Sequence, residues 1–105
     1  MWYGDYSIQH FLDNLARNFI KVNINGMDLN TILKEGTYYA FWKNNCLNIP
    51  IPDFNAEFLL IVFELSNAIE GYKIQIFIDC TTDCRTYIRG WNYSESKYGP
   101  WKKIF

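Results

Sequence analysis

The sequence predicts a mainly β protein, a small antiparallel sheet or sandwich of about five strands with an N-terminal helix. Two observations carry this prediction. From residue 36 onward, β-branched and aromatic residues fill short segments that polar turns separate. Residues 6–20 instead place apolar side chains at the spacing of one helix face. With 105 residues, the chain is expected to form one β domain at 27–105, preceded at 1–26 by the helix and its connector.

The last third predicts three consecutive antiparallel strands. Lys73–Asp79 and Thr86–Trp91 are rich in β-formers, and the turn between them, Thr81–Asp83, has side chains that bond their own backbone. A third strand is expected within Tyr98–Phe105. It follows Gly99 and a proline, which cannot donate to a ladder, so an edge position is predicted.

Two further strands are predicted upstream, at Gly36–Trp42 and Glu57–Leu65, with a proline-containing loop over 43–55 between them. The second of these is apolar on both faces, which predicts a central strand that is covered on each side. Before them, residues 21–25 alternate apolar and polar side chains up to an Asn25–Gly26 turn. Residues 27–33 are expected to form a helical turn or an irregular connector.

The predicted N-terminal helix has a plausible N-cap at Ser7. Its apolar face consists of Ile8, Phe11, Leu12, Leu15 and Phe19. Two interpretations remain open for this helix: it packs on the sheet, or it packs against copies of itself in an oligomer.

Composition argues against several classes of partner. The net charge is −1 and the chain lacks a clustered basic face, so no nucleic-acid partner is expected. No run of about twenty apolar residues is present, so membrane insertion is not expected. The three cysteines, Cys46, Cys80 and Cys84, are interpreted as reduced thiols of a protein made in a cytosol, with a Cys80–Cys84 bridge as the alternative.

The residues do not predict a catalytic site, a metal site or a cofactor. His10 is the single histidine, and no set of ligands surrounds it at metal-binding spacing. The acidic residues are scattered over turns and strand ends. We therefore do not expect an enzyme. A small glycan hydrolase is the alternative, and its carboxylate pair would come from Asp53, Glu57, Glu64, Glu70, Asp79 and Asp83.

The surplus in this sequence is aromatic and amide side chains near strand ends. Flat rings stack on sugar rings, while amides and guanidinium groups pair with hydroxyls, so this inventory predicts a glycan-binding patch. The alternative is that the tryptophans fill the core. The predicted ligand-binding residues are Arg89, Trp91, Asn92, Tyr93, Tyr98 and Trp101, with the loop asparagines Asn44, Asn45 and Asn48 as secondary candidates.

An ordered set of short segments resembles the knob-like domain of phage tail fibres and pyocin-type tail proteins. The resemblance covers residues 27–105, and the apolar 58–65 strand and the N-terminal helix depart from it. The segments that carry it are Asp28-Leu29-Asn30, Gly36-Thr37-Tyr38, Asn48-x-Pro50, Tyr72-x-x-Gln75, Thr86-Tyr87-Ile88-Arg89 and Tyr98-Gly99-Pro100-Trp101-Lys102-Lys103-Ile104.

The resemblance implies a receptor-binding module of a virion tail fibre, made in the host cytoplasm, without catalysis. It implies a homotrimer that contacts other tail proteins and attaches to a host-surface glycan or another receptor. In such a trimer, the N-terminal helix would join the knob to a shaft. The alternative under the same resemblance is a purely structural fibre or baseplate assembly module.

Overall fold

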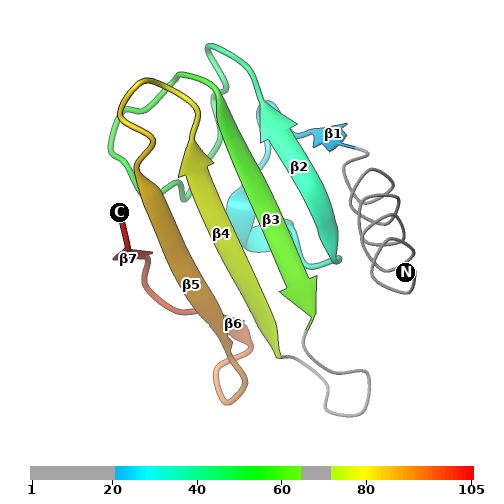
Figure 1. The fold of residues 1–105 in the computed structure, drawn as a ribbon. Coiled ribbons are helices and arrows are strands. Elements are labelled where there is room, and N and C mark those ends of the chain that lie inside the picture. The colour runs from blue at the N-terminus through cyan, green and yellow to red at the C-terminus, as the bar shows by residue number, and fades with distance from the viewer. Residues whose placement is uncertain (1–20, 65–71) are drawn as a thin grey trace, which may run out of the picture.

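The computed structural model describes residues 21–64 and 72–105, which build one mixed β-sheet (Figure 1). The strand order is β1-β2-β3-β4-β5-β6, and β7 also pairs with β5. The predicted N-terminal helix and its alternatives fall on residues outside the described part of the chain. The elements are β1 (Lys21–Asn23), the 3-10 helix η1 (Leu29–Thr31), β2 (Gly36–Ala40), β3 (Phe58–Glu64), β4 (Lys73–Asp79), β5 (Thr86–Asn92), β6 (Lys97–Tyr98) and β7 (Lys102–Lys103).

The mainly β class is confirmed, while the finer picture changes in three respects. The strands lie in a single seven-stranded sheet, so the sandwich alternative does not apply to the described residues. The segment predicted as one strand, 98–105, is divided into β6 and β7. Pro100 lies between them, where its missing N–H cannot interrupt a ladder, and the Gly99 N–H donates to the Gly90 carbonyl at 2.8 Å.

The sheet is also not wholly antiparallel, because β1 runs parallel to β2 with Val22 opposite Tyr38. All other strand pairs are antiparallel. A parallel pair needs a crossover of about a dozen residues, and the chain between β1 and β2 supplies it. This crossover contains the predicted Asn25–Gly26 turn, where Gly26 has φ +81°, and the predicted helical turn, which is η1.

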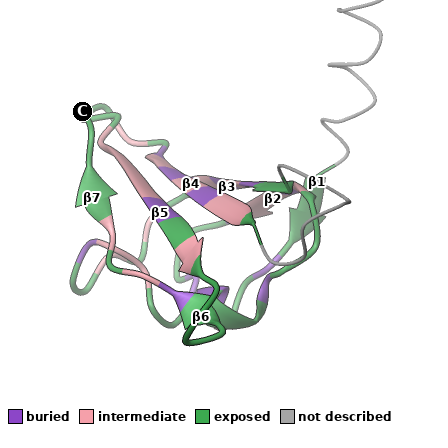
Figure 2. Cartoon of the chain, turned by 90° about the horizontal axis from the view of Figure 1, so that it is seen from below, coloured by how far each residue is buried: buried purple, intermediate pink, exposed green. Residues whose placement is uncertain are grey.

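One face of the sheet packs against a layer made of loops (Figure 2). On this inner face Leu60 lies opposite Phe77, and the Phe58 and Phe77 rings stack with centroids 4.6 Å apart. Apolar side chains from η1, its flanks and the 43–55 loop cover these strands. The buried core consists of Ile24, Leu29, Ile32, Ala40, Cys46, Ile51, Phe58, Leu60, Val62 and Phe77.

The opposite, outer face of the sheet is aliphatic and only partly buried. It includes the cross-strand row Ile61–Ile76–Ile88, in which each residue lies opposite the next. The prediction that 57–65 is a central, two-faced apolar strand is thus confirmed for its position between β2 and β4. On its second face Leu59 and Ile61 are partly buried, and Phe63 at the end of that face is 43 % exposed.

The 43–55 segment is a loop, as predicted, and a buried asparagine holds it in shape. Asn44 is 1 % exposed, and its amide nitrogen donates to the carbonyls of Phe54 and Ala56. Its side-chain oxygen accepts the Cys46 N–H at 2.8 Å. Asn44 is therefore a structural residue, because its donors and its acceptor are all used inside the loop.

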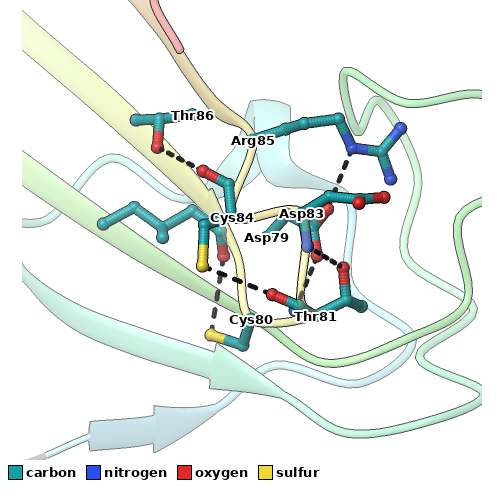
Figure 3. A network of polar contacts seen from close by, with 8 residues as sticks. Asp79, Cys80, Thr81, Asp83, Cys84, Arg85 and Thr86 are labelled. Carbon is teal, nitrogen blue, oxygen red and sulfur yellow. Dashed lines mark hydrogen bonds and ion pairs between the residues drawn. The ribbon is translucent and has the colours of Figure 1, made fainter.

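Asp79 organises the β4–β5 turn through a network of polar contacts (Figure 3). Its side chain has no exposed surface. Its carboxylate accepts the Thr81 N–H at 2.8 Å and Nε of Arg85 at 3.0 Å. Burial alone would raise the pKa of Asp79, but these hydrogen bonds and the Arg85 charge outweigh it and lower the pKa. Cys80 and Cys84 flank this turn as free, exposed thiols, so the structure contains no bridge between them.

Candidate functional site

Arg89 occupies an unusual position for a charged residue, on the inner face of β5 with only 6 % of its surface exposed. The β4–β5 register places it opposite Gln75, which is completely buried. Charged side chains are rarely buried unless polar partners compensate them. Arg89 and Gln75 therefore form the centre of a buried polar network.

Gln75 ties the guanidinium to the crossover layer. Nε of Arg89 donates to Oε1 of Gln75 at 2.8 Å, and the Gln75 amide donates to the carbonyls of Leu29 and Ile32 at 2.8 and 3.0 Å. These carbonyls belong to the first residue and the C-cap of η1, where the Leu29 carbonyl also accepts the Ile32 N–H. Nη1 of Arg89 donates to Oδ1 of Asn30, also in η1, at 2.8 Å.

Two aromatic rings enclose the guanidinium plane. Its central carbon lies 4.5 Å from the Tyr98 ring centroid and 4.3 Å from that of Trp101. Contacts of this kind favour a cation, most of all where water is excluded. The rings are themselves anchored: the Tyr98 hydroxyl donates to the Ile32 carbonyl at 2.9 Å, and Nε1 of Trp101 donates to the Asn48 carbonyl at 3.0 Å.

The network keeps Arg89 charged at neutral pH although burial opposes the charge. Burial lowers the pKa of Arg89 to about 10, although the electrostatic effect of Tyr98 and Asp28 partly raises it. Burial raises the pKa of Tyr98 to about 12, so its hydroxyl stays protonated and remains a donor at pH 7. Arg89 has no carboxylate partner within the described residues, where the ion pairs are Arg85–Asp79 and Lys97–Glu95.

Beside this network lies an open cleft of about 550 Å³, which we call the Arg89 cleft. Side chains of η1, the 43–55 loop, β5 and the β5–β6–β7 segment line it. The polar groups on its walls are three amides, two cations and one carboxylate, next to the Trp101 ring. The amides belong to Asn30, Asn48 and Asn92, the cations are Arg89 and Lys97, and the carboxylate is that of Glu95.

The structure brings four of the six predicted site residues into the Arg89 cleft, namely Arg89, Asn92, Tyr98 and Trp101. Of these, Tyr98 is only 7 % exposed, so its ring serves mainly as a wall behind Arg89. Trp91 lines an adjoining cleft of about 420 Å³ that shares Arg89 and Asn92.

Tyr93 and two of the loop asparagines lie away from the Arg89 cleft. Tyr93 is 58 % exposed and its ring stacks against Tyr72 with centroids 6.4 Å apart. Asn48 belongs to the cleft, whereas Asn44 and Asn45 line a separate hollow within the 43–55 loop. The predicted surplus of rings is therefore divided between the core, the cleft and isolated exposed positions.

Two residues of the network were not among the predicted site residues, Asn30 and Gln75. Both lie in segments that carry the resemblance described above, together with Asp28, which accepts the Asn48 amide at 2.7 Å. Segments that are up to about seventy residues apart thus meet around one guanidinium, since Asn30, Asn48, Gln75 and Trp101 all contact it or its partners. Their place in those segments was the signal in the sequence that could have identified these two residues.

The candidate carboxylates of a hydrolase do not gather in this cleft. Asp79 is engaged by Arg85, and Asp53, Glu57, Glu64 and Asp83 are absent from the cleft lining. His10 and Glu70 lie outside the described residues. Among residues 21–64 and 72–105, no group of three or more His, Cys, Asp or Glu side chains is placed to hold a metal ion, and no helix there has the length and apolar character needed to cross a bilayer.

Comparison of this chain with protein families, with curated proteins and with solved structures found no match. The resemblance to tail-fibre knob domains therefore stays a prediction from the short segments that carry it.

Proposed function

We propose that this chain is a virion tail-fibre or tail-tip module that attaches to a host-surface glycan through the Arg89 cleft, without catalysis. The observation that supports it is the composition of that cleft. Three amides and two cations surround one partly exposed tryptophan, and side chains of this kind recognise sugar hydroxyls and the apolar face of a sugar ring.

The cleft walls are held in place before any ligand arrives. Asn48 is fixed by its bond to Asp28, and the Trp101 ring by its bond to the Asn48 carbonyl. Preorganised groups bind with a smaller entropy cost than mobile ones. Single sugar sites are nevertheless weak, so attachment would depend on several copies acting together, which a trimeric fibre provides.

A second candidate function is a purely structural fibre or baseplate module. The accessible outer face of the sheet favours it, because Ile61, Ile76 and Ile88 form an apolar row of the kind found in protein interfaces. The internal role of Arg89 and Gln75 is equally compatible with it. In this case the chain would assemble with copies or other tail proteins and would bind no glycan.

A glycan array probed with the labelled full chain separates these functions. We expect binding that Lys97→Ala weakens, since Lys97 is an exposed cation of the cleft. Lys34→Ala is the matched control, because Lys34 is an exposed lysine outside the cleft lining. Equal binding by both variants, or no binding to any glycan, would contradict the proposal. Release of new reducing ends from a bound glycan would favour the hydrolase alternative.

A further inference from the structure

The guanidinium of Arg89 has one nitrogen that the network leaves unused. Nε bonds Gln75 and Nη1 bonds Asn30, whereas Nη2 is buried and has no hydrogen-bond partner. It is the single buried side-chain nitrogen or oxygen of this kind among the described residues. An unpaired buried donor costs free energy, and a charged donor costs more than a neutral one.

The carboxylates around the Arg89 cleft are already engaged elsewhere. Oδ1 of Asp28 accepts from the Asn48 amide and from the Asn30 N–H, at 2.7 and 2.8 Å. Oε2 of Glu95 accepts from the Asn92 amide at 3.3 Å and lies 3.7 Å from Nζ of Lys97. Neither forms an ion pair with Arg89, so the guanidinium charge has no carboxylate partner in this region.

We propose that the Arg89 cleft binds an acidic sugar, and that Nη2 of Arg89 donates to the carboxylate of that sugar. This inference rests on the proposed glycan-binding function and narrows its ligand to one chemical class. Glu95 and Lys97 pair with each other, and Asp28 acts on Arg89 without forming an ion pair with it. A charge-assisted hydrogen bond to Nη2 would be stronger than one to a neutral acceptor, which favours an anionic group on the sugar.

The position of the unused nitrogen also favours a single oxygen atom as its partner. Carboxylates and phosphates are both commonly held by the two-nitrogen fork of arginine, but here Nη1 is already bonded to Asn30, so Nη2 alone is left for a ligand oxygen. Because Nη2 is buried, a ligand in the cleft reaches it only after the side chains that cover it move. Asn92 and Lys97 are exposed residues of the cleft lining.

Replacing Asn30 with aspartate tests whether the unbalanced charge of Arg89 attracts the ligand, while Arg89 itself stays in place. In Asn30→Asp, the side chain still accepts from Nη1 of Arg89 and also supplies the missing negative charge inside the protein. Asn23→Asp is the control with the same change in net charge: Oδ1 of Asn23 accepts the Asn25 N–H on the exposed β1 edge, outside the cleft. Both variants preserve the acceptor that the fold uses.

The measurement is a titration of the full chain followed by the Trp101 Nε1–H resonance in ¹H–¹⁵N spectra, assigned with Trp101→Phe. The probes are glucuronic, galacturonic and N-acetylneuraminic acids, the uncharged methyl ester of each, and acetate. We expect at least one acid to bind saturably and its methyl ester to bind about tenfold more weakly, which is the size of one charge-assisted hydrogen bond. Asn30→Asp should weaken binding of the acid by a similar factor and leave the ester unchanged, while Asn23→Asp should affect neither.

The outcomes separate this inference from the function on which it rests. Equal binding of an acid and its ester, or equal loss in both variants, would overturn the acidic-sugar inference and leave glycan binding standing. No response to any sugar, charged or uncharged, would overturn both. If acetate binds as tightly as the sugar acids, the contact between Nη2 and a carboxylate stands, but the claim that the cleft recognises a sugar is overturned.

Discussion

Nε of Arg89 donates to Oε1 of Gln75 at 2.8 Å, and the two residues face each other across the β4–β5 register. The pair joins the sheet to the crossover layer, because Gln75 holds the carbonyls at both ends of η1. The same pair fixes the orientation of the guanidinium at the cleft wall. Stability and the candidate site therefore depend on one buried contact, which the first prediction addresses.

Gln75→Leu is expected to lower the free energy of unfolding by about 3 kcal/mol, because it removes three buried hydrogen bonds at once and leaves Nε of Arg89 without an acceptor. Gln75→Glu is the informative comparison, since it keeps an acceptor for Arg89 and removes both donors to η1. Urea unfolding at pH 7 measures both variants. If the two variants retain wild-type stability, the network is not the link between the sheet and η1.

Trp101→Ala is expected to destabilise the fold by about 3 kcal/mol, because the ring packs on Arg89 and Phe77 and its indole nitrogen bonds the Asn48 carbonyl. Trp42→Ala is the matched control, because Trp42 is 61 % exposed, and its expected change is within about 0.5 kcal/mol. Thermal unfolding of both variants provides the measurement. An equal loss of stability in the two variants would contradict the assignment of Trp101 to the packed interior and Trp42 to the surface.

The ion pair in the β4–β5 turn predicts a specific pH dependence. The pKa of Asp79 is lower in the folded chain than in the unfolded chain, so its ionised form stabilises the fold above the unfolded value of about 3.9. That contribution is lost as the pH falls through the folded pKa. Asp79→Asn should therefore be less stable than wild type at pH 7, by about 1–3 kcal/mol, with a difference that shrinks below pH about 3.9.

Urea unfolding over a series of pH values tests the Asp79 prediction. Asp83→Asn serves as the control, because Asp83 is an exposed acid in the same turn whose side chain forms no ion pair with a described residue. A stability difference between Asp79→Asn and wild type that stays constant from pH 7 to pH 2 would show that the Asp79 charge does not act through this linkage.

The outer face of the sheet predicts how the proposed trimer responds to a charge. Ile76→Lys places an ammonium at the centre of the Ile61–Ile76–Ile88 row, where it would be buried on association. Sedimentation of the full chain at micromolar concentration is expected to show trimers for wild type and monomers for this variant, with matching circular dichroism. Lys103→Glu on the edge strand β7 is the charge-changing control. A monomeric wild type would contradict the trimer.

The cysteines predict a thiol pattern that reports on the fold. A thiol reagent should modify Cys80 and Cys84 in the native protein, because both are exposed, and Cys46 only after unfolding, because it is 8 % exposed. Burial and the Asp79 charge raise the pKa of Cys80, so it should react more slowly than its exposure alone suggests. Counting modified thiols with and without urea makes the test. No fast thiol, with a single thiol modified in urea, would indicate a Cys80–Cys84 bridge, the alternative that the sequence left open.

The sequence by itself determined the local elements of this protein. Alternating β-branched and aromatic residues located β2 to β5, Asn25–Gly26 and Thr81–Asp83 located two turns, and a two-faced apolar segment placed β3 at the centre of the sheet. These features follow from side-chain sterics and turn chemistry over a few residues, which neighbours in the sequence decide.

Only the tertiary structure decided which residues meet. The parallel direction of β1 depends on the path of the crossover, and the roles of Asn30 and Gln75 depend on contacts to residues 59 and 14 positions away in the chain, respectively. Whether a ring is core or surface follows from the same contacts: Tyr98 is buried against Arg89, whereas Trp42 and Tyr93 are exposed. The burial of these rings is a property of the packed layers, and the local sequence around each ring does not distinguish them.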